Sequence, residues 1–131
     1  SRAGNVLQTE FEQGNVPFLR QVARTVSGRV LSDSAGLRDF FQAEGKTYSP
    51  FWTPEVAWLF SGQPGPHAAT RLRSLGFSHL LLKRSSITFD FLTKTGASPA
   101  LEGHLRAVMA NDTFILLEVQ EETPTPEAPR G

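Results

Sequence analysis

Four small or polar residues, Ser32, Asp33, Ser34 and Gly36, follow a short apolar segment and precede an expected helix. Open α/β sheets bind ligands at the carboxyl ends of their strands, and the free N–H groups at a helix start attract phosphate. Ser34 and Gly36 are suited to contribute such groups, whereas the carboxylate of Asp33 would repel a phosphate. Because serine and aspartate also cap helices by default, two interpretations stay open. The turn either binds a sugar phosphate or nucleotide, or simply provides a cap from Asp33 or Ser34.

Aromatic side chains are densest around Tyr48, Trp52 and Trp58. Exposed rings of this kind stack on sugars, lie at a membrane interface or form a surface that binds another protein. The alternative is a core patch, since Phe51, Trp58 and Leu59 can nearly all face inward together. The three residues Tyr48, Trp52 and Trp58 are therefore the candidate interaction surface.

The remaining reactive side chains form no motif. His67, His79 and His104 are not spaced as metal ligands on one helix or strand. The absence of cysteine excludes disulfides, thiolate catalysis and zinc–thiolate sites. A hydrolase assembled from the serines and aspartates lacks the Gly-x-Ser-x-Gly pattern that would support it. We therefore expect no catalytic residue, metal or cofactor in this chain.

Length and charge bound the class of protein. The 131 residues suit one domain with a modest core, and 13 basic residues balance 13 acidic ones. A balanced charge gives no electrostatic argument for binding nucleic acid. No apolar run approaches the roughly 20 residues that cross a bilayer. The chain has no initiating methionine, and we interpret it as a piece of something larger.

The first half of the chain predicts alternating helices and short strands. Residues 16–26 place Phe18, Leu19, Val22 and Val26 on one helical face, and Gly28 is expected to end this helix. Residues 29–32 form a candidate strand, 37–45 a helix that buries Leu37, Phe40 and Phe41, and 46–50 a second strand. Thr53 and Pro54 then mark the start of another helix.

The clearest structural signal is the stretch 68–84. A helix ends at Gly76, where glycine supplies a left-handed turn, and the run Leu80 to Leu82 is apolar on both faces, as a covered strand must be. Residues 113–119 form another strand. The segment before it fits either a helix or a strand, and the turn residues at Asn111 favour a hairpin.

The predicted fold class is α/β: a small three-layer sandwich whose short, mostly parallel sheet has helices on both faces and an antiparallel C-terminal edge strand. Residues 1–15 are a lead-in, residues 16–120 are the single domain, and a short helix is expected from Ser98. Residues 121–131 are rich in proline and glutamate and are expected to be a disordered tail.

Residues 71–86, RLRSLGFSHLLLKRSS, and 105–119, LRAVMANDTFILLEV, together resemble the soluble C-terminal domain of polytopic bacterial membrane glycosyltransferases that use lipid-linked phosphosugars. In that family a helix ends in a leucine-glycine turn, an apolar strand follows, and the chain closes with a strand of the form F-x-L-x-E-V. The counterparts here are residues 75–77, 78–82 and 114–119. The resemblance covers roughly residues 16–120 and rests on the order of these elements.

In such enzymes the catalytic acid and the lipid donor site lie among the membrane spans, so the resemblance implies no catalytic residue in this chain. It implies instead a non-catalytic accessory domain on the periplasmic face of the inner membrane. That domain would cover the active site or contact an acceptor glycan or protein. Its main partner would be the transmembrane part of the same polypeptide.

Overall fold

The computed structural model describes residues 15–34, 36–60, 67–86, 101 and 103–120, and this part of the chain contains a five-stranded mixed sheet. The sheet confirms the predicted small α/β sandwich. β1 pairs in parallel with its neighbours β2 and β3, whereas β5 pairs antiparallel with both β3 and β4. The order across the sheet is β2 (Tyr48–Pro50), β1 (Arg29–Ser32), β3 (Phe77–Lys83), β5 (Phe114–Val119) and β4 (Leu105–Ala110).

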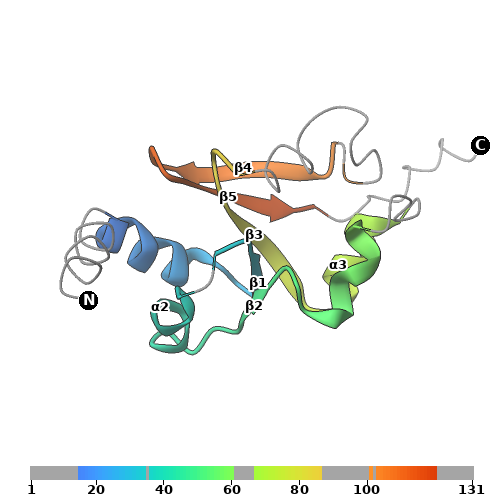
Figure 1. Ribbon diagram of the computed structural model, residues 1–131, viewed down its shortest axis with the longest axis horizontal. Helices are drawn as coiled ribbons and strands as arrows, with labels where there is room; N and C mark the ends of the chain where they lie inside the picture. The colour runs from blue at the N-terminus through green and yellow to red at the C-terminus, as the bar shows by residue number, and fades with distance from the viewer. Residues whose placement is uncertain (1–14, 35, 61–66, 87–100, 102, 121–131) are drawn as a thin grey trace, which may run out of the picture.

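Helices lie on both sides of the sheet (Figure 1). The N-terminal helix, residues 15–25, and α2 (Arg38–Gln42) cover one face. The 3₁₀ helix η1 (Pro54–Phe60) and α3 (Ala68–Ser74) cover the other. Each face of the sheet therefore has its own hydrophobic cluster.

The N-terminal helix packs through the face that the sequence predicts. Leu19, Val22 and Val26 are buried in the cluster beneath this helix, and Phe18 stacks on Phe114 of β5 with 6.5 Å between ring centroids. Apolar residues at this spacing form one stripe along a helix, so a single face meets the sheet.

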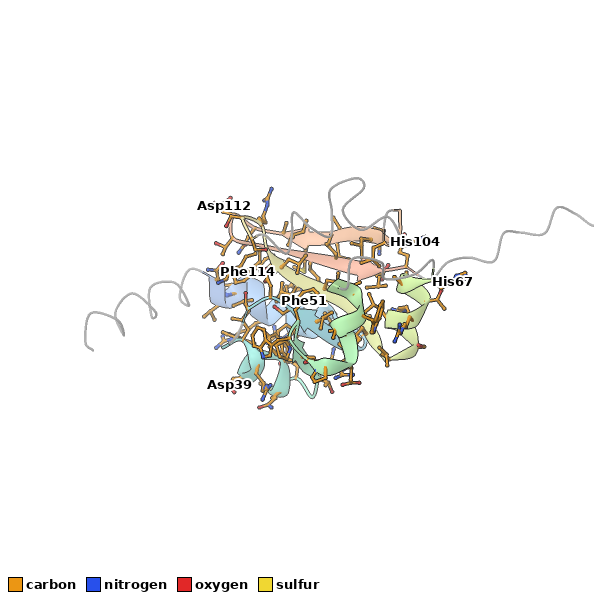
Figure 2. The ribbon with its side chains drawn as sticks, turned by 45° about the vertical axis from the view of Figure 1, so that its right-hand side comes forward. Asp39, Phe51, His67, His104, Asp112 and Phe114 are labelled. Carbon is orange, nitrogen blue, oxygen red and sulfur yellow. The ribbon has the colours of Figure 1, made fainter. Side chains whose placement is uncertain are left out.

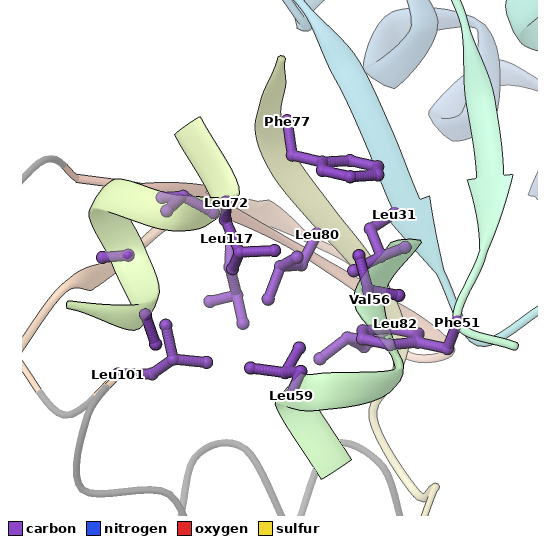
Figure 3. Close-up of a cluster of buried hydrophobic side chains, with 13 residues drawn as sticks. Leu31, Phe51, Val56, Leu59, Leu72, Phe77, Leu80, Leu82, Leu101 and Leu117 are labelled. Carbon is purple, nitrogen blue, oxygen red and sulfur yellow. The ribbon is translucent and has the colours of Figure 1, made fainter. Parts of the chain in front are cut away.

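β3 is buried on both faces along almost its whole length. Leu80 and Leu82 point into the cluster under α3 and η1, drawn in Figure 3, whereas Leu81 between them points into the cluster under the N-terminal helix. Successive side chains of a strand alternate between faces, which explains why three leucines in a row are needed here. The prediction of a covered strand is confirmed.

The two turns that frame the sheet are also as predicted. Gly76 ends α3 with a φ of 93°, and the N–H of Gly76 donates to the carbonyl of Arg73. At the hairpin between β4 and β5, the side-chain oxygen of Asn111 accepts hydrogen bonds from the N–H groups of Thr113 (2.9 Å) and Phe114 (2.7 Å). The hairpin interpretation of this segment is confirmed.

Two local predictions are wrong. The N-terminal helix ends at residue 25, before Gly28, which serves a different purpose. A Cβ at position 28 would lie 2.9 Å from the carbonyl oxygen of Gly76, so glycine is needed there because two backbone segments approach closely. The second helix, expected over residues 37–45, is only the five-residue α2.

Several predicted segments lie outside the described residues. These are almost the whole lead-in, the short helix expected from Ser98, and the proline-rich tail. Residue 15, the last of the predicted lead-in, is already helical.

Candidate functional site

The polar side chains of the turn after β1 form hydrogen bonds with other groups of the protein. Ser32 Oγ accepts a hydrogen bond from the N–H of Ser34 at 3.1 Å, and the carboxylate of Asp33 accepts from the N–H of Lys83 at 3.1 and 3.3 Å. Ser34 Oγ donates to Asp33 Oδ1 at 3.3 Å. Asp33 thus ties the end of β1 to the end of β3, its neighbour in the sheet.

The expectation that Asp33 or Ser34 caps the second helix is wrong. The residue preceding α2 is Leu37, and no side chain caps it. The carboxylate of Asp33 is directed across the sheet to Lys83 instead, and Gly36 continues the turn with a φ of 86°. Since α2 has only five residues, it offers no helix dipole of consequence for a phosphate. Binding of a phosphate by the turn itself stays a prediction.

The three candidate aromatic residues occupy three different environments. Tyr48 is buried at the start of β2, in the cluster beneath the N-terminal helix. Trp58 packs against the opposite cluster, donates its Nε1–H to the carbonyl of Glu55 at 2.7 Å and lies under the guanidinium of Arg71, 4.2 Å from the ring centroid. Trp52 is 65% exposed. They do not form one surface.

The core interpretation holds for part of this aromatic set. Phe51 and Leu59 are buried in the cluster under η1, and Trp58 packs against their cluster. Trp52 is the exception: among the described residues it is the exposed large apolar side chain. Tryptophan is enriched at binding interfaces, so its exposure here marks Trp52 as a candidate contact residue.

Trp52 borders a cavity of about 230 Å³ at the carboxyl ends of β1 and β2. The loop after β1, the start of α2 and the end of β2 together form its walls. Its lining residues are Gly36, Arg38, Tyr48, Pro50 and Trp52. The carboxyl edge of parallel strands is where open α/β sheets bind ligands. The cavity therefore brings Gly36 from the polar turn together with Tyr48 and Trp52 from the aromatic set.

Within this cavity wall, Tyr48 carries an unusual hydroxyl. The side chain is 7% exposed, and its hydroxyl has no hydrogen-bond partner among the described residues. Burial raises the pKa of Tyr48, and the nearby carboxylate of Asp33 adds to the rise. The hydroxyl of Ser32 and the positive charge of Arg38 lower this pKa in part. Ser32 nevertheless does not form a hydrogen bond with the hydroxyl of Tyr48. The phenol is neutral and retains a free donor.

Sequence reasoning missed Arg38 and Pro50 as parts of this site. Arg38 is exposed and forms no ion pair with a described residue. A signal for Arg38 was present, because the positions three and four residues away on either side hold no acidic residue. A helical arginine without such a neighbour is available to a ligand.

The histidines do not meet at a metal site. His67 and His104 lie toward one end of the molecule (Figure 2), and no group of three described histidine, aspartate or glutamate side chains could hold a metal ion. His79 is buried within the sheet, where its Nδ1 lies 2.6 Å from Ser78 Oγ. Because Ser78 Oγ also accepts from the N–H of Gly28, its hydroxyl is left to donate to a neutral His79.

Comparison with protein-family models, with curated proteins and with solved structures finds no match to this chain. No helix in the described part of the chain has the length and apolar character that crossing a membrane requires.

Proposed function

We propose that this chain is a non-catalytic accessory domain of a membrane-embedded, lipid-phosphosugar-dependent glycosyltransferase, located on the periplasmic face of the inner membrane. In this role it contacts the acceptor, or covers the active site that the transmembrane part of the polypeptide provides. The observation that carries the proposal is the exposed indole of Trp52 at the mouth of the cavity. An accessory domain needs a contact surface of this kind and no reacting groups.

Further support comes from the segments that carry the resemblance. The helix that ends at Gly76 leads directly into β3, and β3 lies beside the closing strand β5 in the sheet, with His79 opposite Glu118. The pattern therefore corresponds to the centre of a fold rather than to scattered similarities. Family membership itself is part of the proposal.

Cell fractionation tests the proposal directly. An antibody against residues 15–120 should detect a band in the membrane fraction of the source cells that is far heavier than the 14.4 kDa of this chain. A band near 14 kDa in the soluble fraction would contradict it. As a second arm, the purified chain should transfer no sugar from a lipid-linked donor, and turnover by the fragment would exclude a non-catalytic role.

The main alternative is a stand-alone binding module for a protein or a phosphorylated ligand. Exposure of Trp52 favours a contact surface in either case, whereas the internal hydrogen bonds of Ser32, Asp33 and Ser34 leave those side chains less available. Fractionation separates this alternative from the accessory domain, because only the latter requires a larger membrane-bound parent.

A further inference from the structure

Three groups without partners converge on the cavity beside Trp52. Within the described part of the chain, the guanidinium of Arg38 forms no ion pair and the buried hydroxyl of Tyr48 has no hydrogen-bond partner, while the indole of Trp52 is open to solvent. A buried polar group without a partner costs stability, so native proteins rarely keep one. The side chain of Tyr48 lines the cavity, so a ligand in the cavity would lie beside this buried hydroxyl.

We propose that this cavity binds a single saccharide unit that carries an acidic group, a carboxylate or a phosphate. The sugar ring stacks on the indole of Trp52, the acidic group pairs with Arg38, and a sugar hydroxyl accepts a hydrogen bond from Tyr48. This inference rests on the proposed function, because it names the chemistry of the acceptor that the domain would contact.

The size of the cavity suits one sugar unit. Its volume of about 230 Å³ is below the roughly 300–1,000 Å³ of pockets that hold drug-sized molecules. The walls combine apolar surface from Pro50 and Trp52 with two hydrogen-bond donors, on Arg38 and Tyr48. A sugar ring presents the matching surface, with C–H groups on its faces and hydroxyl oxygens around its rim.

The charge at the cavity favours an acidic ligand. Arg38 is the charged member of the five lining residues. The carboxylate of Asp33 raises the pKa of Tyr48, but its oxygens already accept hydrogen bonds from Lys83 and Ser34. A guanidinium binds carboxylate or phosphate through two parallel N–H bonds, which makes Arg38 selective for these groups.

A second cavity, of about 280 Å³ between the N-terminal helix and α2, lacks these features. Charges of both signs line it, and Arg24 already lies 3.8 Å from Glu44 across it. It therefore has no unbalanced charge to attract an anion, and it gives a suitable position for a control substitution. Its lining residues are Arg20, Arg24, Asp39, Phe40, Ala43 and Glu44.

Nuclear magnetic resonance of the 131-residue chain tests the assignment. The chain has two tryptophans, so its indole N–H groups give two signals, and Trp52→Phe identifies the one at the cavity. We expect D-glucuronic acid and glucose 6-phosphate to shift the Trp52 signal saturably. Glucose should bind at least tenfold more weakly, and inorganic phosphate should not reproduce the shift. The tighter of the two acidic sugars tells whether the ligand is a carboxylate or a phosphate.

Substitutions then separate binding from folding. Arg38→Ala should remove the preference for acidic sugars, whereas Arg20→Ala, an exposed arginine at the second cavity, should preserve it. Tyr48→Phe should weaken binding while raising Tm, because it removes a buried hydroxyl without a partner. A purely structural tyrosine would show the opposite change in Tm.

Each adverse result has a separate meaning. If neither acidic sugar shifts the Trp52 signal, or if Arg38→Ala binds them unchanged, the inference is wrong. If inorganic phosphate binds as well as glucose 6-phosphate, the cavity is an anion site and not a sugar site. If neutral oligosaccharides alone bind at Trp52, the acidic class fails while the accessory role survives, and that role fails independently if the chain fractionates as a free 14 kDa protein.

Discussion

The two ends of β1 differ in how their polar groups are used. At the start of β1, Arg29 pairs with both carboxylate oxygens of Glu55 at 2.7 and 3.1 Å, and its guanidinium lies 4.3 Å from the ring centroid of Phe77. At the far end of β1, beyond Ser32, Arg38 and Trp52 have no ion pair or ring contact of this kind with another described residue. The start of β1 is closed by an ion pair, and we call it the paired end; the far end combines the internal hydrogen bonds of Asp33 with the cavity beside Trp52, and we call it the open end.

Glycine substitutions at the two ends should give the largest contrast. Gly28→Ala should destabilise the protein by about 2–3 kcal/mol, because its Cβ would collide with the carbonyl oxygen of Gly76. At the open end, Gly36→Ala meets nothing within 4 Å and bears only the strain of its φ of 86°, about 1 kcal/mol. Urea unfolding of both variants measures the difference. Equal losses would remove the contrast.

The two tryptophans provide the next test. Trp58→Ala should cost about 2 kcal/mol, since it removes packing on the cluster, a hydrogen bond and the stacking of Arg71. Trp52→Ala should change stability by no more than about 0.5 kcal/mol, because its side chain is largely in water. Thermal melts of both variants check this prediction. A loss at Trp52 as large as that at Trp58 would mean that Trp52 is structural.

A gain in stability is expected at the open end. Tyr48→Phe should stabilise the ligand-free protein by about 1 kcal/mol, because the ring remains packed while a buried hydroxyl without a partner is removed. Tyr48→Leu serves as the control that loses the contact with the ring of Phe41 and should destabilise. Calorimetry of the three proteins gives the order, and a less stable Tyr48→Phe variant would show that the hydroxyl has a partner.

The smallest change in stability should come from a change in pH, which acts through His79 near the paired end of the sheet. Burial lowers the pKa of His79 below 6.5, although the carboxylate of Glu118 opposes this change. The unfolded chain therefore binds a proton at His79 more readily than the folded protein does, and stability should fall as the pH drops through and below 6.5. The remaining charged groups that act on His79 all lower its pKa further, and they are Arg73, Arg106 and Lys46.

Melting temperatures between pH 7.5 and 5 measure this dependence. His79→Gln should flatten the profile over that range, since it removes the titrating group and keeps a polar side chain of similar reach to Ser78. Below pH 4.5 a separate loss is expected, because the hydrogen bonds from Arg106 hold the pKa of Glu118 below its usual value. A profile without change between pH 7.5 and 5 would mean that His79 is not the responsible group.

Much of the fold follows from local pattern. The unbroken apolar run from Leu80 to Leu82 predicted a strand covered on both faces, and Gly76 and Asn111 predicted the turns beside it. These signals depend only on residues close together in the chain, so the strand and its turns can be predicted from the sequence alone. The helix cap failed because the carboxylate of Asp33 bonds a strand fifty residues away, and no local pattern contains that information.

The site was predictable only in part, for the same reason. Tyr48, Trp52 and Gly36 were found from residue type, but their assembly into one cavity depends on the pairing of β1 with β2. Arg38 was missed because the only local signal is the absence of an acidic residue three or four positions away, which by itself does not mark a binding residue. Trp58 was grouped with Trp52 because of its type, and the structure separates them by placing Trp58 against the opposite cluster.

The burial of β3 on both faces determines how the protein unfolds. Leu80 and Leu82 belong to one hydrophobic cluster and Leu81 to the other, so neither layer of helices can leave the sheet without exposing the same strand. The two layers should then melt in one cooperative transition, with the amides of β3 among the last to exchange with solvent. The cavity beside Trp52 therefore lies on a sheet that unfolds as one unit, and we expect its walls to be preformed before a ligand binds.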